Sequence, residues 1–390
     1  MSISKVGGKM KILYMTMMYP VPGCPQKGVF CHEQVKALIH EGVEVDVIVP
    51  LPFYDDEYET DTWIFEGVKI RYIKYFKIPG TIGFQYIGKY LYLALKKAKI
   101  DFKKYDILHA DAPLPAGDAI RRISKEYHIP YVIHGHGLDV FFSNSYREAK
   151  NCKKITEICI KVYEEADAVA GVSQKVLNCI KQRVDISSKG YVIYNGVDTE
   201  KFLPIEHENK KLELISIGNL IPLKGHKYTI LAIKKLVEAG YDNVHLRIFG
   251  RGEQETELVQ LVQKIKMENY VQFMGYVQYE QVAKALQMSD IFILPSYYEA
   301  LGCVYLEAMA CGIPVIGCKE NGIDEIIKDG EDGYLIQGKS VESIVESIKK
   351  MLENRRYKVM GVQARKHVEE KYSWRSSAQS LIKLYRNIIG

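Results

Sequence analysis

Short apolar runs alternate with longer amphipathic segments along most of this chain of 390 residues. The runs have the length of buried β-strands, and the segments between them repeat apolar positions every three to four residues, as helices do. This alternation predicts α/β domains whose parallel sheets are covered by helices on both faces. Strands are expected at 11–18, 43–50, 68–72, 106–109, 131–134, 168–172 and 191–194, and again at 212–217, 244–249, 271–274, 291–294, 314–317 and 333–336.

A polar stretch at 194–211, with a turn signal at Asn195-Gly196, separates the two series of strands. A chain of this length also exceeds what one hydrophobic core usually supports. We therefore expect two tandem doubly wound, Rossmann-like domains, 1–196 and 197–371, that face each other across a cleft. Ligands of such domains bind outside the carboxyl ends of the strands, so the residues that follow strands are the candidates for chemistry.

The composition is that of an ordinary globular protein, with 26% charged residues and a net charge of +5. Apolar runs stay below the roughly 18 residues that a membrane span requires, and the first residues lack the apolar core of a signal peptide. The cysteines form no C-x-x-C pair and the histidines form no H-E-x-x-H motif. These features predict a cytoplasmic protein with reduced thiols and no metal site.

The stretch 67–104 is rich in positive charge, with ten Lys or Arg and one acid, Asp101, and aromatic residues lie among the cations. One interpretation is that residues 68–104 form a face that rests on the anionic inner surface of the plasma membrane, where a lipid-linked acceptor would wait. The plainer interpretation is a solvated basic face over a helix whose apolar side is core. Nucleic-acid binding is a third interpretation, and we expect no nucleic-acid partner.

The segment YYEALGCVYLEAMACG (297–312) places two glutamates, Glu299 and Glu307, among residues with little side chain. A helix is expected to begin near Gly302 without a Ser, Thr, Asp or Asn at the capping position. Its free N–H groups, from about Leu301 on, suit an anion such as a diphosphate. The two carboxylates suit sugar hydroxyls on either side of that anion. The alternative is a helix with one exposed glutamate and one in a core network.

Two further loops follow strands of the second domain. The loop in ISIGNLIPLKGH contains Gly218 and Lys224, whose ammonium group can neutralise phosphate as a point charge. The loop in IFGRGEQE contains Gly250 and Arg251 and has the start of a dinucleotide fingerprint, with a glutamate in place of its third glycine. Both loops are also consistent with ordinary strand-to-helix turns.

Polar residues follow strands of the first domain as well, in VIHGHGLDV (132–140) and DILHADAPLPAG (106–117). A histidine at such a strand end can donate to a phosphate or sugar oxygen, acidic residues could bind the acceptor, and a glycine ahead of a helix could bring backbone N–H groups to a phosphate. The candidates are Gly28, His109, Asp111, His136 and Asp139, of which His109, Asp111 and Asp139 are expected on the acceptor side. Each could instead be structural, and for His134 we prefer that interpretation.

These motifs together resemble those of the family 4 glycosyltransferases, which are retaining enzymes that use nucleotide-sugars on a B-type glycosyltransferase (GT-B) fold. The span from Glu299 to Glu307 matches the family's E-x-x-x-x-x-x-x-E signature, and LEAMACGIPVIG (306–317) matches its strongest block. DILHA, HGLD, YNGVD and VQFMGYV match weaker blocks, so the resemblance covers nearly the whole chain. Residues 372–390 resemble the family's last helix, which crosses back onto the first domain. The chain is most similar to bacterial enzymes of surface-polysaccharide or teichuronic-acid assembly.

The resemblance implies a UDP- or GDP-sugar donor and a glycan or lipid-linked acceptor, without a cofactor or a metal. Glu299 would hold hydroxyls of the donor sugar, Glu307 the ribose, and Lys224 the diphosphate. His136 would support the transferred sugar or its leaving group, which makes His136, Lys224 and Glu299 the implied catalytic residues. The implied donor site consists of Gly28, which would meet the phosphates on closure, the main chain near Val277, which would read the base, and Gly218, Asn219, Lys224, Gly250, Arg251, Glu299, Ala300, Leu301, Gly302 and Glu307.

The chain departs from the family pattern at two places. Asn219 stands where the family usually has an arginine, and Asn321-Gly322 stands where it usually has Gly-Gly. Arg251 or another cation could replace the missing charge. The alternative functions are a nucleotide-sugar epimerase or phosphorylase of the same fold, an NAD-dependent oxidoreductase and a non-catalytic binder. The oxidoreductase requires an intact G-x-G-x-x-G, which neither predicted domain contains.

Overall fold

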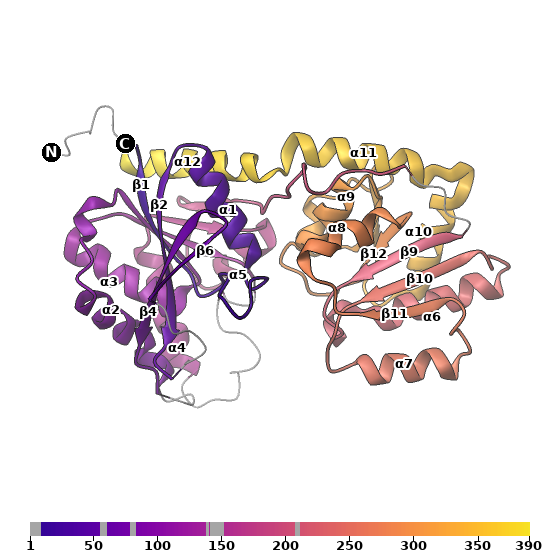
Figure 1. Cartoon of the computed structure of the whole chain (residues 1–390), viewed down its shortest axis with the longest axis horizontal. Helices are drawn as coiled ribbons and strands as arrows, with labels where there is room; N and C mark the ends of the chain where they lie inside the picture. Colours follow the sequence, from indigo (N-terminus) through magenta and orange to yellow (C-terminus); the bar gives the residue numbers. More distant parts are fainter. Residues whose placement is uncertain (1–8, 55–60, 79–82, 138–139, 141–151, 207–210) are drawn as a thin grey trace. The chain divides into compact units, whose positions relative to one another are not determined.

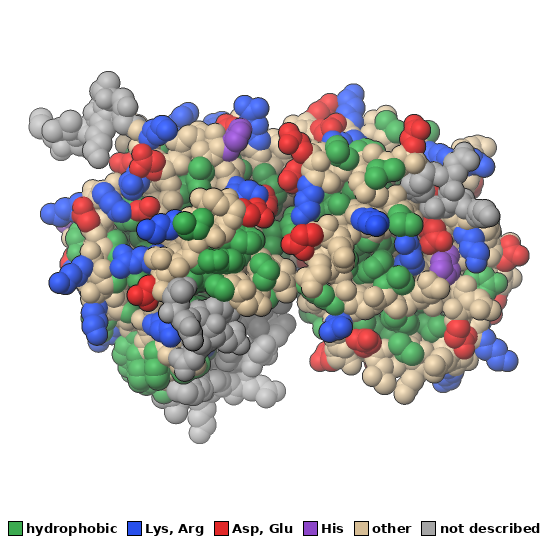
Figure 2. Space-filling view, in the orientation of Figure 1, with side chains coloured by type: hydrophobic (Ala, Val, Ile, Leu, Met, Phe, Trp, Pro, Cys, Tyr) green, Lys and Arg blue, Asp and Glu red, His purple; other side chains and the backbone are tan. Residues whose placement is uncertain are grey.

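The computed structural model of the chain describes residues 9–54, 61–78, 83–137, 140, 152–206 and 211–390. Its contacts divide the chain into two compact units, Met1–Asn195 with Trp374–Gly390, and Gly196–Ser373. Each unit is an α/β domain built on one sheet (Figure 1). On the face drawn in Figure 2, Lys and Arg side chains are interspersed with Asp and Glu over both units, in keeping with the small net charge.

The sheet of the first unit has the strand order β3-β4-β2-β1-β5-β6-β7-β8. Neighbouring strands are parallel except β3, which runs antiparallel to β4 at the edge. The sequence analysis missed β3, whereas the seven parallel strands of this unit lie where they were predicted. The strands are β1 (Lys11–Met15), β2 (Glu44–Pro52), β3 (Thr62–Phe65), β4 (Val68–Tyr75), β5 (Ile107–Asp111), β6 (Tyr131–Gly135), β7 (Ala168–Gly171) and β8 (Gly190–Val192).

Helices cover this sheet, and the last helix of the chain is one of them. The helices are α1 (Val29–His40), α2 (Ile87–Lys97), α3 (Asp118–Tyr127), α4 (Cys152–Glu165), α5 (Gln174–Lys181) and α12 (Trp374–Ile389), with short helical turns η1 (Phe84–Tyr86), η2 (Phe102–Lys104) and η3 (Pro113–Gly117). Helix α12 packs beside α1 (Figure 1) and buries Leu381, Leu384 and Tyr385 in the same core as Ile12 and Tyr14 of β1. The C-terminal segment is therefore part of the first unit's core.

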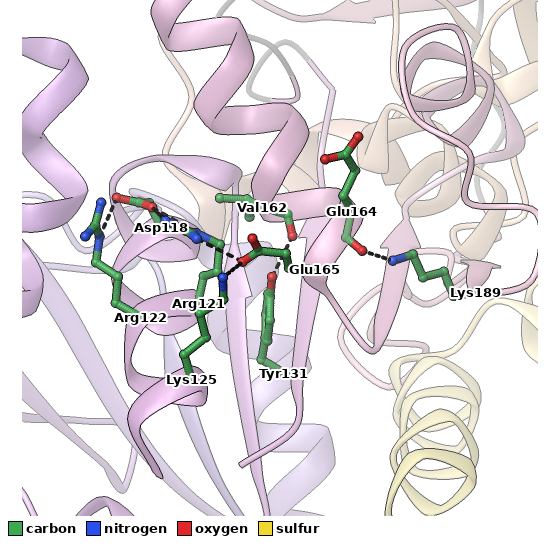
Figure 3. A network of polar contacts seen from close by, with 9 residues as sticks. All are labelled: Asp118, Arg121, Arg122, Lys125, Tyr131, Val162, Glu164, Glu165 and Lys189. Carbon is green, nitrogen blue, oxygen red and sulfur yellow. Dashed lines mark hydrogen bonds and ion pairs between the residues drawn. The ribbon is translucent and has the colours of Figure 1, made fainter. Parts of the chain in front are cut away.

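A buried carboxylate fixes the start of α3. Asp118 is 1% exposed, and its two oxygens receive hydrogen bonds from Arg121 and Arg122 (Figure 3). Arg121 continues to Glu165 at the end of α4. Gly88 of α2 packs on the same acid, since a Cβ there would lie 2.4 Å from Asp118 Oδ2. Two guanidinium groups thus compensate a charge that would be costly to bury alone.

The sheet of the second unit has the order β11-β10-β9-β12-β13-β14 and is parallel throughout its described pairs. All six strands were predicted. The strands are β9 (Leu212–Ile217), β10 (Val244–Phe249), β11 (Val271–Gly275), β12 (Ile291–Ile293), β13 (Val315–Cys318) and β14 (Gly333–Ile336). The helices are α6 (His226–Glu238), α7 (Glu255–Lys264), α8 (Tyr279–Gln287), α9 (Cys303–Ala310), α10 (Val341–Leu352) and α11 (Arg356–Lys371), with short turns η5 (Pro222–Lys224), η6 (Gly322–Glu325) and η7 (Glu353–Arg355).

Both sheets have the doubly wound order, in which the direction of winding reverses once. The reversal falls between β1 and β5 in the first unit and between β9 and β12 in the second. Loops that leave the carboxyl ends of these strands diverge to opposite faces of the sheet, which leaves a crevice for a ligand. In the part of the chain that the structure describes, no helix has the length and apolar character needed to cross a bilayer.

Candidate active site

In the first unit, strand register gathers polar side chains at the carboxyl end of the sheet. Tyr14 of β1 lies beside His109 of β5, and Asp111 lies beside His134 of β6. Partners in a parallel pair, and residues two apart on one strand, face the same side of the sheet. The four side chains therefore share one face, and the rings of Tyr14 and His109 stack with their centroids 4.5 Å apart.

Asp111 is the centre of this cluster. Its Oδ1 accepts hydrogen bonds from the Tyr14 hydroxyl at 3.1 Å and from His136 Nε2 at 2.9 Å, and its Oδ2 accepts one from Cys31 Sγ at 3.2 Å. His109 Nε2 lies 3.4 Å from Oδ1. Burial opposes ionisation, but the charge of His136 and the hydrogen bonds of His109 and His136 hold the pKa of Asp111 well below its usual range.

Two predicted residues of the first unit lie at adjoining loops. His136 follows β6, and Phe30 packs against it with ring centroids 5.1 Å apart. Gly28 stands two residues before Phe30, at the start of α1, with a φ of 62°. A Cβ at Gly28 would lie 2.1 Å from the carbonyl oxygen of Met18, so close packing of the loop against itself requires the glycine here.

The structure places the predicted acceptor-side residues differently from our expectation. His109 is 0% exposed and Asp111 is 3% exposed, so both lie beneath His136 within the hydrogen-bonded cluster. The strand-end pattern did not distinguish a side chain that faces a ligand from one that faces the covering helices. Asp139 lies outside the described residues. His134 is buried, and burial keeps its pKa well below the usual value, which fits a structural residue.

In the second unit, the loops after β9, β10 and β11 touch one another. The Leu220 N–H donates to Arg251 O at 2.9 Å, and the Gly250 N–H donates to Gly275 O at 2.8 Å. A Cβ at Gly250 would lie 2.0 Å from Gly218 O, so a side chain there would push two of the loops apart. The predicted residues Gly218, Asn219, Gly250, Arg251 and Val277 thus stand on three adjoining loops.

The loop after β12 joins this group through Glu299. The Glu299 carboxylate forms an ion pair with the ammonium group of Lys224 from the loop after β9. The backbone holds the same two loops together, because the Tyr297 N–H donates to Leu223 O at 3.0 Å. The ion pair spans the point where the winding of the sheet reverses, which is where a ligand is expected. The predicted catalytic residues Lys224 and Glu299 are therefore neighbours.

Asn321 braces the Glu299 loop from the other side. Its Oδ1 accepts a hydrogen bond from the Glu299 N–H at 3.0 Å, and its Nδ2 donates to Ser296 O at 3.1 Å and Lys319 O at 3.2 Å. Gly322 is just as closely packed, since a Cβ there would lie 1.7 Å from Ala300 O. In the sequence Asn321 stands out only as a departure from a family pattern, and this contact was not predicted.

Helix α9 starts as the sequence predicted, without a side-chain cap. Gly302 is the capping residue, with a φ of 84°, and Leu301 before it is buried. Glu307 lies within α9 and is half-buried. Burial raises the pKa of Glu307 to about 7, against the opposing charge of Lys201. Burial therefore favours a protonated carboxyl near neutral pH unless a ligand or a cation favours the charged form.

Comparison with known proteins identifies the family of this chain. A model described as Glycosyltransferase Family 4 matches residues 28–201, and one described as Glycosyl transferases group 1 matches residues 198–367. Together the two models span 28–367, which is most of the chain. The chain belongs to the family 4 glycosyltransferases. This confirms the recognition made from the motifs, and it places both halves of the chain among transferases rather than oxidoreductases.

Relatives match the glycosyltransferase over nearly its full length. The N-acetyl-alpha-D-glucosaminyl L-malate synthase of Bacillus anthracis is 28% identical over 379 residues, covering 93% of this chain and 93% of that protein. The putative teichuronic acid biosynthesis glycosyltransferase TuaC of Bacillus subtilis is 27% identical, covering 87% and 88%. These identities place the chain among glycosyltransferases of several substrate classes.

Solved structures share the fold of the glycosyltransferase. Sucrose-phosphate synthase from Thermosynechococcus elongatus superposes with a TM-score of 0.79 at 18% identity, covering 97% of this chain and 99% of that one. Anabaena Alr3699/HepE in complex with UDP superposes with a TM-score of 0.75 at 18% identity, covering 97% and 100%. The fold is therefore GT-B, with two Rossmann-like domains, as predicted.

Two sets of side chains in the described part of the glycosyltransferase have spacings that could suit a metal ion. They are Cys31, Asp111 and His136, and His109, Asp111 and His134. Both sets share Asp111, whose oxygens already receive the hydrogen bonds described above. Tyr14, Cys31 and Tyr385 were not predicted as members of this cluster, because each comes from an apolar run or a helix with no motif of its own.

Proposed function

We propose that the glycosyltransferase moves a sugar from a nucleoside-diphosphate sugar to a glycan or lipid-linked acceptor, with retention of anomeric configuration, in the synthesis of a cell-surface polysaccharide. The observation that carries the donor assignment is the ion pair of Lys224 with Glu299 where the second sheet reverses its winding. A cation and a carboxylate held side by side there match a diphosphate linked to a sugar.

In this proposal the ligand-free pair separates when the donor binds. The diphosphate takes the ammonium group of Lys224, with the uncapped N-terminus of α9 at Gly302 beside it. Hydroxyls of the donor sugar take the carboxylate of Glu299. Glu307, whose carboxyl is half-buried one helix turn further along, accepts from the ribose. Each charged group of the pair thus exchanges one partner for another. The free-energy cost of desolvating the two groups on binding is therefore small.

Negative charge grows on the diphosphate as the glycosidic bond breaks. Lys224 and the N–H groups at the start of α9 are fixed before the reaction, and such preorganised donors usually supply the largest catalytic effect. His136 is assigned to the transferred sugar or its leaving group. The acceptor attacks from the face of the leaving diphosphate, which takes its proton. A labelled donor that gives an inverted product would exclude this route.

The substrates of similar proteins support the choice of substrates. Anabaena Alr3699/HepE is described with UDP-glucose, and a Corynebacterium glutamicum relative is described as a GDP-mannose-dependent mannosyltransferase. TuaC is described in teichuronic acid biosynthesis. We therefore propose a UDP- or GDP-sugar donor and an acceptor of the cell surface. We also propose that transfer needs no bound metal, because Lys224 and α9 supply positive charge at the diphosphate.

Exposed aromatic side chains lie within and beside the basic stretch 68–104. An aromatic patch, defined as Phe53, Tyr54, Phe76, Tyr86 and Tyr90, is exposed or half-exposed in the first unit. Phe53 and Phe76 stack with centroids 5.4 Å apart, and Phe76 contacts Tyr90 at 5.3 Å.

Cations flank the aromatic patch. Lys74 near the end of β4 is exposed two residues before Phe76, and Lys89 of α2 is exposed beside Tyr90. Exposed aromatic rings with lysines beside them suit an anionic lipid surface. We propose that this patch docks the enzyme on the inner face of the plasma membrane, within reach of a lipid-linked acceptor, and that the enzyme is otherwise cytoplasmic.

The donor assignment is tested by isothermal titration of the full chain with UDP, GDP, ADP and NAD(H). We expect binding of one nucleoside diphosphate that Lys224→Ala and Glu307→Ala weaken. Lys227→Ala is the matched control, because Lys227 is an exposed lysine three residues along. Lys224→Ala should be the most severe, since it also leaves Glu299 as an unpaired charge beside the phosphate. Binding of NAD(H) alone, or equal loss in the control, would overturn the assignment.

A further inference from the structure

A path of buried polar contacts connects the last helix to His136, with a hydrogen bond at each end and a 3.4 Å contact between His109 and Asp111 in the middle. The Tyr385 hydroxyl of α12 lies 2.7 Å from His109 Nδ1. His109 Nε2 lies 3.4 Å from Asp111 Oδ1, and the same oxygen lies 2.9 Å from His136 Nε2. Tyr385 and His109 are 0% exposed, so water does not compete for these contacts.

The chemistry of the groups fixes where each proton sits. The pKa of Asp111 lies well below its usual range, because the charge of His136 and the hydrogen bonds of the two histidines outweigh burial. An ionised carboxylate only accepts, so both Nε2 atoms that face it carry protons. The pKa of Tyr385 is raised well above its usual value by burial and then by Asp111, so its hydroxyl stays protonated and donates to His109 Nδ1.

We propose that Tyr385 is a positioning residue for His136: through His109 and Asp111 it fixes the orientation of the His136 ring. The proposal rests on the proposed function only in assigning His136 to the reacting sugar. Helix α12 thereby acts on His136 through buried side chains of the first unit.

The mechanism of this support is a choice between tautomers. Without the Tyr385 hydroxyl, His109 Nδ1 loses its donor, and the proton of a neutral imidazole can sit on either nitrogen. A His109 ring protonated at Nδ1 would turn a lone pair toward the Asp111 carboxylate. The repulsion would shift Asp111, and with it the acceptor that orients His136. At metal sites, removal of the group that orients a ligating histidine typically costs about 10–100-fold in affinity or activity, and we expect an effect of that order here.

The test is Tyr385→Phe, which removes the hydroxyl and keeps the buried ring. The matched control is Tyr131→Phe, since Tyr131 is also buried in the first unit. Its hydroxyl donates to Val162 O at 2.8 Å (Figure 3), not to a residue of the path from Tyr385 to His136. Nitrogen NMR of histidine-labelled protein reads directly which ring nitrogens of His109 and His136 carry protons. We expect both sets of signals to change in Tyr385→Phe and neither to change in the control.

Steady-state kinetics gives the second measurement. We expect kcat to fall about 10-fold or more in Tyr385→Phe, with the KM for the donor little changed. A purely structural role would lower both variants' stability alike and leave the histidine signals unmoved. Equal behaviour of the two variants in both measurements would overturn the proposal.

The NMR arm separates this proposal from the proposed function. If the wild type transfers no sugar, the proposed function fails, but the histidine signals still show whether Tyr385 is connected to His136. Asp111→Asn is a second variant, because an amide that can turn its NH₂ toward His136 Nε2 should change the His136 signals more than Tyr385→Phe does. Unchanged His136 signals in Asp111→Asn would also reject the connection.

Discussion

Asn321 Oδ1 accepts a hydrogen bond from the backbone N–H of Glu299, 3.0 Å away, across the loops that follow β12 and β13. The other end of the same carboxamide donates to Ser296 O and Lys319 O. Asn321 is only 4% exposed, so these three hydrogen bonds are protected from water. A residue that departs from the family's glycine pattern thus clamps the loop that carries the Glu299 carboxylate.

We therefore expect Asn321→Ala to weaken donor binding through the position of the Glu299 loop, although Asn321 is assigned no contact with the donor. The substitution leaves the Glu299 N–H and two carbonyl groups without their partner, at a cost of about 1–3 kcal/mol shared between folding and binding. Calorimetric titration with the nucleotide and thermal unfolding would measure the two shares.

The control for this prediction is Asn243→Ala, at an exposed asparagine of the same unit. Asn321→Asp refines the test, because it keeps an acceptor for the Glu299 N–H and loses both donors. If Asn321→Ala bound the nucleotide as the wild type and the control do, Asn321 would have no part in placing Glu299.

Hydrophobic pattern predicted most of the fold because buried parallel strands are nearly continuous apolar runs. Strand β3 (Thr62–Phe65) was not predicted, because four residues with alternating exposure at a sheet edge are too few to show a strand's hydrophobic pattern. The donor-side residues stay a prediction. The contact between Lys224 and Glu299 was not predicted, although both stand on loops after strands that the doubly wound order makes neighbours.

The supporting contacts could not be predicted in the same way. Tyr385 meets His109 across 276 positions of sequence, and Cys31 meets Asp111 across 80. Pairing at such distances depends on how α1 and α12 lie on the sheet, which local pattern does not encode. For the same reason Asp111 was expected at the acceptor surface, although the covering helices bury it.

The pH dependence of stability should report on Glu307. Its pKa is raised from 4.5 to about 7 by burial, so the folded state binds more protons than the unfolded state between these values. Stability from this group is fully present below about pH 4.5, and it is lost as the pH rises toward 7. Wild-type protein should lose more thermal stability between pH 5 and about 8 than Glu307→Gln, which is neutral throughout.

Nucleotide affinity should show the opposite trend if the Glu307 carboxylate accepts from the ribose. Affinity of the wild type is then expected to rise as the pH increases through about 7, because the charged form becomes available. The affinity of Glu307→Gln should stay flat over the same range. Parallel curves for the two proteins, in both stability and affinity, would contradict the assignment of Glu307.

Removal of metal ions should leave transfer unchanged. Lys224 and the start of α9 are proposed to supply the positive charge at the diphosphate, and the oxygens of Asp111 already accept hydrogen bonds from His136 and Cys31. Activity after EDTA treatment, compared with EDTA saturated with calcium as the control, measures this. A loss that Zn²⁺ or Mn²⁺ restores would point to a metal at Cys31, Asp111 and His136 instead.

The aromatic patch should bind anionic vesicles through both its rings and its lysines. Phe76→Ser removes a ring that contacts two others, Phe53 and Tyr90. Lys89→Gln removes an exposed cation, which near an anionic surface is worth about 1 kcal/mol. Both variants should sediment less with phosphatidylglycerol vesicles than the wild type does, and salt should weaken the wild type's binding.

Lys96→Gln is the matched control for the lysine. Lys96 lies on the same helix, but its ammonium group pairs with Glu126 and bonds to Tyr127, which holds it against α3 and away from direct contact with a lipid headgroup. Its replacement should leave vesicle binding nearly unchanged. Equal losses in Lys89→Gln and Lys96→Gln would mean that the diffuse charge of the basic stretch attracts the vesicles. Undiminished binding in Phe76→Ser would remove the patch from the proposal, and the acceptor would then have to reach the enzyme by another surface.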